Sequence, residues 1–429
     1  MENRSSKINA GALVRRERRL PYKLLLPTFL LVLGVVLFPL FANFWISFKP
    51  VLLADLRSPE LSIREKVLSA SETKSDTVRL EYRYRNPSKK YNLTEVKFDD
   101  RVPDGASVQE VDPRCKVKVN LVPRVISCEL GALEPKARGR VAVTLAFYEP
   151  VLARQLLLKT KPEASFQTKN VLTSFEFTLS NYFKLFSSAE FWNVLKITIY
   201  YTVFGTAGAL LMGLFAAQIM RSVFPGRAIV RGFLLFPYVA PVIAVAFSWV
   251  VLFDPFSGVI NHLLIEMGEI KQPINFFGQR TVEVELFGHK FNLPLALSMV
   301  ILFEIWRYFP LSFLFILARM QSIPKDVYEA AEMDGASPLQ QFWFLSLPNI
   351  VGILAILFLL RFIWTFNKFD DIFLLTGGNA GTRTLTVNVY EQAFAISNLG
   401  AGAAVASVVF VILLSVSGIF IYFLPKDHG

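Results

Sequence analysis

Charge, histidine and cysteine are all scarce in this sequence. Asp, Glu, Lys and Arg make up only 18% of the 429 residues, whereas an average soluble domain has about 25%. The three His and two Cys show no metal-ligand spacing, which excludes a structural zinc site. The sequence also lacks the phosphate loop Gly-x-x-x-x-Gly-Lys-Ser/Thr, the Gly-x-Ser-x-Gly elbow and the His-Glu-x-x-His pair. We therefore expect no ATP site, no catalytic residue and no metal in this chain, and we predict that it is not an enzyme.

Apolar residues are abundant and lie in long runs. Hydrophobic residues make up 53% of the chain, including 40 Phe. Residues 24–48 carry no charge and are long enough to cross a bilayer core of about 30 Å. This run is longer than the apolar part of a signal peptide and lacks a small-x-small cleavage site, so we expect a retained helix at 22–48. Further apolar runs lie at 197–220, 232–253, 291–318, 342–367 and 398–424. The sequence therefore predicts an all-α polytopic membrane protein with six transmembrane helices.

The basic residues lie beside these apolar runs, although the net charge of +11 would also suit a nucleic-acid-binding protein. With six spans, the basic residues next to the spans fall on one side of the membrane, as the positive-inside rule requires. They are Arg15, Arg16, Arg18, Arg19, Arg221, Arg227, Arg231, Arg319, Lys325 and Lys426. This pattern predicts a membrane protein with its N-terminal segment 1–21 and its tail 425–429 in the cytoplasm. We expect no binding of nucleic acid.

A long polar insert at 49–190 predicts a separate domain between the first span and the others. Apolar residues alternate with charged residues at 78–84 and again at 141–147, as in half-buried strands. Shorter strands are predicted at 117–121 and 125–130, separated by turn signals. We predict a small β-sandwich on the outer side of the membrane.

Cys115 and Cys128 fall on the two arms of a predicted hairpin in this insert. A disulfide between them would stabilise the domain by about 3 kcal/mol in an oxidising compartment. Two reduced, buried cysteines are the alternative, and the sequence leaves both open.

A polar stretch at 324–337 interrupts the apolar second half and predicts a short exposed helix. Pro324 suits the first turn, and the Glu-Ala-Ala run at 329–331 favours helix. Gly335 is placed to end this helix, and Ser337 can cap the next one. A solvated loop between two membrane helices is the alternative interpretation.

This stretch resembles the EAA signature of the permease subunits of ABC importers. The resemblance rests on residues 329–331, Gly335, Leu345 and Leu347-Pro348, with Leu345 in place of the usual Ile. The flanking residues 321–324 and 334–336 resemble the sugar-importing, maltose-type branch. The resemblance covers residues from about 190 to 424 plus the first span, and implies a type I importer fold with its core at 191–424. It also implies that 324–337 is a cytoplasmic coupling helix held in a cleft of the ATPase subunit, with contact residues Glu329, Ala330, Ala331, Asp334, Gly335 and Ala336.

Two weaker resemblances concern the outer parts of the chain. Residues 102–105 and 128–133 resemble the immunoglobulin-like repeats of bacterial surface proteins, which implies an immunoglobulin-like insert. Thr376-Gly377-Gly378 resembles a loop of the sugar branch that meets the solute-binding protein, although Asn379-Ala380 replaces the proline that usually follows.

Charged residues inside the predicted spans suggest a polar cavity, because charge is costly in a membrane. Glu304 and Arg307 are three residues apart in the fourth span and therefore lie on one helical face. They form either an ion pair that only ties helices together or part of a polar pocket, and the sequence leaves both open.

The resemblance to maltose-type permeases places the pocket in three spans. It implies pocket-lining roles for Tyr238, Val242, Glu304, Arg307, Tyr308, Leu311, Thr365 and Lys368. The two tyrosines would stack on a sugar ring, with ordinary aromatic packing as the alternative. The charges of Glu304, Arg307 and Lys368 depart from the neutral lining of the maltose type and predict a solute with an acidic group.

Together these features predict the permease subunit of an ATP-driven, binding-protein-dependent importer of a sugar or sugar derivative. ATP and Mg²⁺ would bind to a separate ATPase subunit. The other expected partners are a second permease subunit, an extracytoplasmic solute-binding protein and membrane lipid. Two further classes stay open: a membrane-anchored adhesin or scaffold whose active part is the β insert, and a passive channel.

Overall fold

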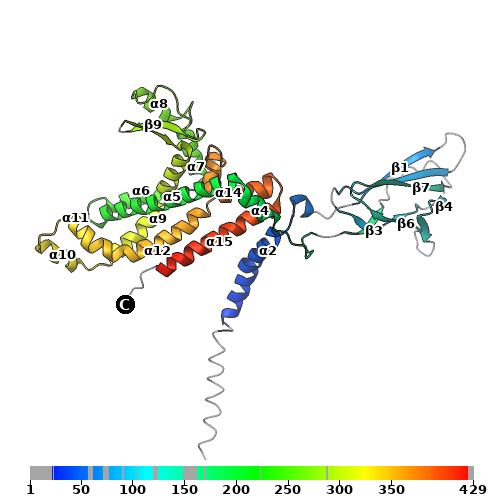
Figure 1. Ribbon diagram of the computed structural model, residues 1–429, viewed down its shortest axis with the longest axis horizontal. Helices are drawn as coiled ribbons and strands as arrows, with labels where there is room; N and C mark the ends of the chain where they lie inside the picture. Colours follow the sequence, from blue (N-terminus) through cyan, green and yellow to red (C-terminus); the bar gives the residue numbers. More distant parts are fainter. Residues whose placement is uncertain are drawn as a thin grey trace, which may run out of the picture. The chain divides into compact units, whose positions relative to one another are not determined.

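The computed structural model in Figure 1 consists of two compact units. It describes residue 22 and residues 24–56, 61–70, 77–88, 91–103, 105–118, 124–147, 162–168, 171–222, 224–286 and 288–423. One unit comprises Val51–Phe177, and the other comprises Met1–Pro50 with Thr178–Gly429. The predicted terminal segments 1–21 and 425–429 lie outside the described residues.

The Val51–Phe177 unit begins with a 3₁₀ turn at Leu53–Leu56 and contains two four-stranded antiparallel sheets. The first has the order β1 (Ser62–Ala70), β2 (Thr77–Arg85), β7 (Arg138–Phe147) and β4 (Ala106–Val111). The second has the order β5 (Cys115–Lys118), β6 (Val125–Leu133), β3 (Leu93–Arg101) and β8 (Glu163–Thr168).

The inner faces of these sheets share one apolar core. Tyr82 of β2 packs on Phe98 of β3 with ring centroids 5.0 Å apart. The alternating patterns at 78–84, 141–147 and 125–130 fall within β2, β7 and β6, because period-two alternation puts every second side chain into this core. The pattern at 117–121 overlaps β5 only at 117–118, and 119–121 lie outside the described residues.

Cys115 and Cys128 are direct cross-strand partners in β5 and β6, and a disulfide joins them. Two carboxyl groups also lie inside this unit. Asp100 accepts a 2.5 Å hydrogen bond from the Tyr82 hydroxyl, and one oxygen each of Glu65 and Asp100 is buried without a partner among the described residues. Burial and the nearby Asp100 raise the pKa of Glu65 to about 7.

The predicted insert 49–190 extends beyond the Val51–Phe177 unit at its C-terminal end. Residues from 178 onward pack with the helices, because α4 (Ser180–Ser187) is tied to the end of the first helix. The Asn181 side-chain amide donates 2.9 Å hydrogen bonds to the carbonyls of Ser47 and Lys49.

The helical unit starts with a helix at Leu24–Ser47 that includes a π-helical turn, Leu33–Leu37, and α2 (Phe38–Ser47). After α4 follow α5 (Ala189–Arg221), α6 (Arg227–Val239), α7 (Val242–Leu252), α8 (Val259–Glu266), β9 (Val282–Leu286), β10 (His289–Leu293), α9 (Leu295–Gln321), α10 (Lys325–Met333), α11 (Pro338–Gln341), α12 (Leu347–Phe366), α13 (Asp370–Thr376), α14 (Leu385–Tyr390) and α15 (Leu399–Phe423). Further π-helical turns precede α12 at Phe342–Ser346 and α15 at Glu391–Ala395.

Among the described residues, five helices are long and apolar enough to span a membrane. A sixth span is counted only if α6 and α7 are taken as one, and these two helices are bent by 94°. The single span predicted at 232–253 is therefore broken. The break lies at Ala240, whose extended backbone (ψ 143°) is the conformation favoured before a proline, here Pro241.

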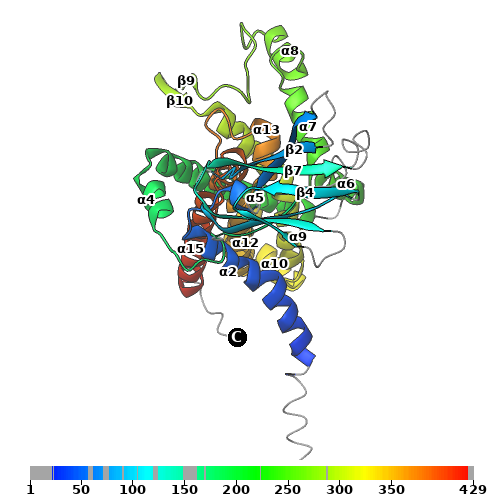
Figure 2. The same cartoon turned by 90° about the vertical axis from the view of Figure 1, so that its right-hand side faces the viewer.

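The span predicted to begin at 291 begins at Leu295 instead, because residues 289–293 form β10. β9 and β10 make an antiparallel hairpin that turns at Gly288 (φ +77°). Figure 2 shows this hairpin and α8 at the same end of the helical unit.

Glycines on α5 allow α9 to approach closely, as small residues do between membrane helices. A Cβ on Gly213 would lie 2.7 Å from the Ser312 Cβ, and one on Gly208 would lie 2.3 Å from the Ile305 Cδ1. Farther along, Gly205 lies beside Glu304, whose Cγ would be 3.0 Å from an added Cβ. The close contact of α5 and α9 therefore brings Glu304 against α5.

Candidate functional site

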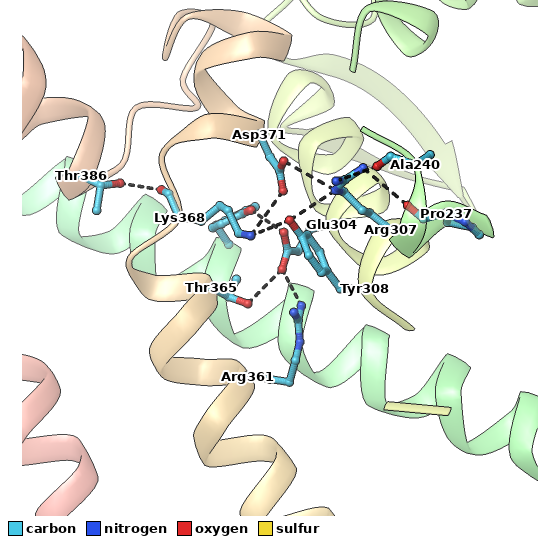
Figure 3. Close-up of polar contacts among 11 residues, drawn as sticks. Pro237, Ala240, Glu304, Arg307, Tyr308, Arg361, Thr365, Lys368, Asp371 and Thr386 are labelled. Atoms are coloured by element: carbon cyan, nitrogen blue, oxygen red, sulfur yellow. Dashed lines mark hydrogen bonds and ion pairs between the residues drawn. The ribbon is translucent and has the colours of Figure 1, made fainter. Parts of the chain in front are cut away.

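Glu304 is the centre of a buried polar cluster in the helical unit (Figure 3). Its carboxylate is 0% exposed and accepts a 2.5 Å hydrogen bond from Arg361 of α12, which is 1% exposed. Thr365, one turn further along α12, donates to the same oxygen at 2.9 Å. The Tyr201 hydroxyl of α5 donates to the other oxygen at 2.9 Å. Three helices are thus joined at one carboxylate, and its charge is fully compensated.

Tyr308 lies in the middle of three cations. Lys368 donates a 2.6 Å hydrogen bond to its hydroxyl and lies 4.0 Å from its ring centroid. The guanidinium groups of Arg361 and Arg307 lie 4.6 and 5.5 Å from the same centroid. The electron-rich face of the ring stabilises such cations where water is excluded. Tyr238 meets Tyr308 edge to face, with centroids 6.1 Å apart.

Arg307 satisfies the backbone at the break between α6 and α7. Pro241 has no N–H to donate to the carbonyl of Pro237, which would be its helical partner. Arg307 donates to that carbonyl at 3.5 Å and to the carbonyl of Ala240 at 3.2 Å (Figure 3). Buried carbonyls need such partners, so Arg307 stabilises the bent pair.

The ion pair between Glu304 and Arg307, one of the two alternatives that the sequence left open, does not occur. Arg307 lies 4.0 Å from Asp371 of α13, while Glu304 pairs with Arg361. Asp371 is fully buried and also lies 3.7 Å from Lys368. The cluster contains three cations and two carboxylates, which leaves one net positive charge.

Six of the eight predicted pocket residues meet in this cluster. They are Tyr238, Glu304, Arg307, Tyr308, Thr365 and Lys368. Val242, at the start of α7, and Leu311, on α9, are half-buried, and no polar or ring contact among the described residues ties them to it. The predicted pocket residues did not include Tyr201, Arg361 and Asp371. Asp371 follows directly after an apolar span, a position at which charge indicates a polar path.

The predicted coupling segment forms α10, an exposed helix. Glu329, Ala330, Asp334 and Gly335 are exposed, and Ala331 and Ala336 are half-buried. Gly335 has φ +80°, which ends the helix in the conformation that glycine favours. Ser337 begins α11 with a capping box that pairs it reciprocally with Gln340. Figure 1 shows α10 at one end of the helical bundle, with α4 and α14 at the other.

One buried tyrosine connects α10 to the bundle. The Tyr328 hydroxyl lies 2.9 Å from the Ser346 hydroxyl, in the π-helical turn before α12. The guanidinium of Arg221, the last residue of α5, lies 3.6 Å from the centre of the Tyr328 ring. These contacts connect α10 to α5 and to the start of α12, the helices that carry Tyr201 and Arg361.

The loop after α13 is built from left-handed residues. Gly377, Gly378, Ala380 and Gly381 all have positive φ, and a Cβ on Gly381 would lie 3.2 Å from Arg280. Asn379-Ala380, which replaces the proline usual in the sugar branch, therefore lies in a tight, glycine-rich turn. This turn packs against the segment before β9.

Comparison with known proteins identifies this architecture. The sequence profile of the family described as "Binding-protein-dependent transport system inner membrane component" matches residues 209–426. The chain is 37% identical over 238 residues to the inner membrane ABC transporter permease protein YcjO of Escherichia coli (strain K12), covering 56% of this chain and 76% of that protein. It is 30% identical over 245 residues to the trehalose/maltose transport system permease protein MalF of Thermococcus litoralis, covering 57% of this chain and 78% of that protein.

A solved structure has a similar fold. It is a chain from the crystal structure of a bacterial ABC transporter involved in the import of the acidic polysaccharide alginate, with a TM-score of 0.51 and 21% identity over 59% of this chain and 86% of that chain. At this identity the likeness shows the fold alone. The family profile and the two relatives show more: this chain belongs to the binding-protein-dependent transport system inner membrane components, the permease subunits of ABC importers.

Proposed function

We propose that this permease imports a sugar or sugar derivative and is driven by a separate ATPase subunit that binds α10. The observation that carries the proposal is an exposed, capped helix with the EAA sequence that is tied to α5 and α12 through Tyr328. The solute class is supported by relatives named for trehalose/maltose and for sn-glycerol-3-phosphate transport; the latter, UgpA of Yersinia pestis, is 31% identical over 252 residues.

The basic residues of the helical unit support a cytoplasmic location for α10. Arg221 contacts α10 directly, and Arg319 ends α9 a few residues before it. Arg227 and Arg231 lie at the start of α6, and Lys325 is the first residue of α10 itself. The positive-inside rule favours the cytoplasmic side for this end, and we accordingly propose that the N-terminus lies inside and the β insert outside a bacterial inner membrane.

The proposed complex needs further subunits. ATP and Mg²⁺ bind to the ATPase, a second permease completes the pathway, and a solute-binding protein delivers the solute from outside. A chain in the structure of a bacterial alginate transporter in complex with an alginate pentasaccharide-bound periplasmic protein has the same fold, at a TM-score of 0.50. The six-span count of this permease core is part of the proposal, with α6 and α7 as one bent span.

The buried cluster favours a solute with an anionic group. Most of its charges are satisfied by one another, but one positive charge is left over. Lys368 is the cation to test, because Arg307 also holds the α6–α7 break. We expect Lys368→Gln to reduce the preference for an acidic over a neutral sugar in uptake by about tenfold, because it removes the excess positive charge. A tenfold change corresponds to about 1.4 kcal/mol in the free energy that separates the two sugars. An unchanged preference would refute this part of the proposal.

The decisive test concerns α10. Glu329→Lys should abolish ATP-dependent uptake in proteoliposomes that contain the assembled importer, because it reverses a charge on the exposed face of α10. The matched control is Glu266→Lys, an equal charge change on exposed α8, which should transport normally. A cysteine at Ala330 should cross-link to a cysteine in the ATPase cleft. Normal transport by Glu329→Lys would favour a passive channel or an anchored adhesin and overturn the proposal.

A further inference from the structure

The outer face of the first sheet of the insert carries a concentration of arginines. Strand register places Arg64 of β1 opposite Arg83 of β2, and Arg83 opposite Arg140 of β7. One step along, Arg85 of β2 lies opposite Arg138 of β7. All five side chains are exposed. Like charges directly opposite each other destabilise a sheet, so this arrangement costs stability unless an anion compensates it.

Among the described residues, one carboxylate on this face compensates part of this charge. Glu81 accepts a 2.5 Å hydrogen bond from Arg83, is nearly buried and also interacts electrostatically with Arg140. Its pair with Arg83 is the only ion pair on this face among the described residues. The other four guanidinium groups thus have no ion-pair partner within that part of the chain.

These arginines line a hollow of about 510 Å³, which is within the usual range for ligand pockets. Ser62, Glu81, Tyr84 and Gly139 also line it. The Tyr84 side chain points to the other face of the sheet, where it is buried in the core of the insert and its ring lies across Gly139. There the Tyr84 hydroxyl accepts a 3.0 Å hydrogen bond from Arg114. Ser62 is therefore the neutral hydroxyl on the same face as the arginines.

We propose that this hollow binds an acidic oligosaccharide, with carboxylates of successive sugars on the arginine rows and a sugar hydroxyl on Ser62. Adjacent strands lie about 4.8 Å apart, so the arginines stand in rows, and planar guanidinium forks match carboxylates in a bidentate manner. The hydroxyl of Ser62 suits sugar better than a bare phosphate chain. A protein partner is disfavoured, because protein interfaces centre on apolar anchors and the only large ring in the lining, Tyr84, is buried. This site lies in the Val51–Phe177 unit, whereas the buried cluster belongs to the helical unit, and it does not depend on the proposed transport activity.

The test uses the purified full-length chain in nanodiscs of phosphatidylcholine. Binding of oligogalacturonate is measured by titration calorimetry at low salt, with a malto-oligosaccharide of equal length as the neutral probe. We expect binding of the acidic probe only, and at least tenfold weaker binding in Arg64→Ser/Arg140→Ser. The matched control, Arg79→Ser/Lys116→Ser, removes two exposed charges outside the hollow and should bind within about twofold of the parent.

A second measurement guards against misfolding. Without ligand, Arg64→Ser/Arg140→Ser should unfold at a temperature equal to or above that of the parent, because it removes facing like charges. Equal loss of binding in the control pair would show a diffuse charge effect and overturn the proposal. So would absence of oligogalacturonate binding, or binding of phosphatidylglycerol nanodiscs or of the solute-binding protein in its place.

Discussion

The buried pair of Glu304 and Arg361 gives the sharpest stability prediction. The two side chains are 0% and 1% exposed, so neither reaches water if the other is removed. Removing one partner of a buried ion pair costs about 3–5 kcal/mol, because the remaining charge is left uncompensated. In Arg361→Met the carboxylate keeps its bonds from Tyr201 and Thr365. We therefore expect Arg361→Met to lower the free energy of unfolding by about 3 kcal/mol, the low end of that range.

The double variant tests the cause of that loss. Glu304→Gln/Arg361→Met contains no unpaired charge, and the amide keeps an oxygen for the neighbouring hydroxyls. The combined cost should therefore fall below the sum of the single costs by about 2 kcal/mol. Unfolding free energies are measured by titration with sodium dodecyl sulfate in mixed micelles, followed by tryptophan fluorescence.

Lys196→Met provides the control for loss of a cation from a membrane helix. Lys196 is exposed on α5, so its replacement should cost less than about 0.5 kcal/mol. Strict additivity of the Glu304 and Arg361 variants, or a cost of Arg361→Met as small as that of the control, would refute the reasoning.

Three more predictions follow from the packing. Tyr328→Phe keeps the ring under Arg221 but removes the hydrogen bond to Ser346, which is worth about 1 kcal/mol. ATP-driven uptake should therefore fall about fivefold, while the ATPase still co-purifies. Unchanged uptake would show that this hydrogen bond does not contribute to the coupling. Gly213→Val should cost about 1–3 kcal/mol in the same micelle titration, because its side chain meets α9, whereas Gly34→Val has open space and should be tolerated. Because the pKa of Glu65 is raised to about 7, the folded insert holds a proton that the unfolded chain releases above about 4.5, so the stability that Glu65 contributes is fully present below pH 4.5 and is lost as pH rises through 7. Since Glu65 is half-exposed and screened by water, we expect a loss on the order of 1 kcal/mol, seen as faster hydrogen exchange of β1 and β2 amides, and Glu65→Gln should abolish the difference between pH 5 and pH 8.

The ends of α10 could be predicted from the sequence because they depend on local chemistry. Gly335 ends the helix through its own backbone conformation, and Ser337 caps the next through a partner three residues away. The strands of the insert are similar, since alternation alone separates the core face from the outer face. Tyr328 could not be assigned in this way, because its partners Arg221 and Ser346 are brought to it by packing.

The pairing inside the membrane cluster could not be predicted from spacing. The rule of three residues along a helix pointed from Glu304 to Arg307, but the carboxylate is satisfied by Arg361, 57 positions away. Arg307 is directed elsewhere by two carbonyls at the break between α6 and α7, those of Pro237 and Ala240. The hairpin before α9 was missed because no strand was predicted at 282–286 and residues 291–293 of β10 adjoin an apolar run and were included in the predicted span.

The bend between α6 and α7 has a mechanical consequence. Pro241 has no N–H, so straightening the span would not form the backbone hydrogen bond that is missing there. Arg307 of α9 donates to two carbonyls at the α6 end of the break, and α7 packs on α9 and α13 through its own side chains, as Trp249 does on Phe303. A change of the bend angle would therefore act on the Arg307 bonds and on this packing, while the backbone at Pro241 has no hydrogen bond to lose.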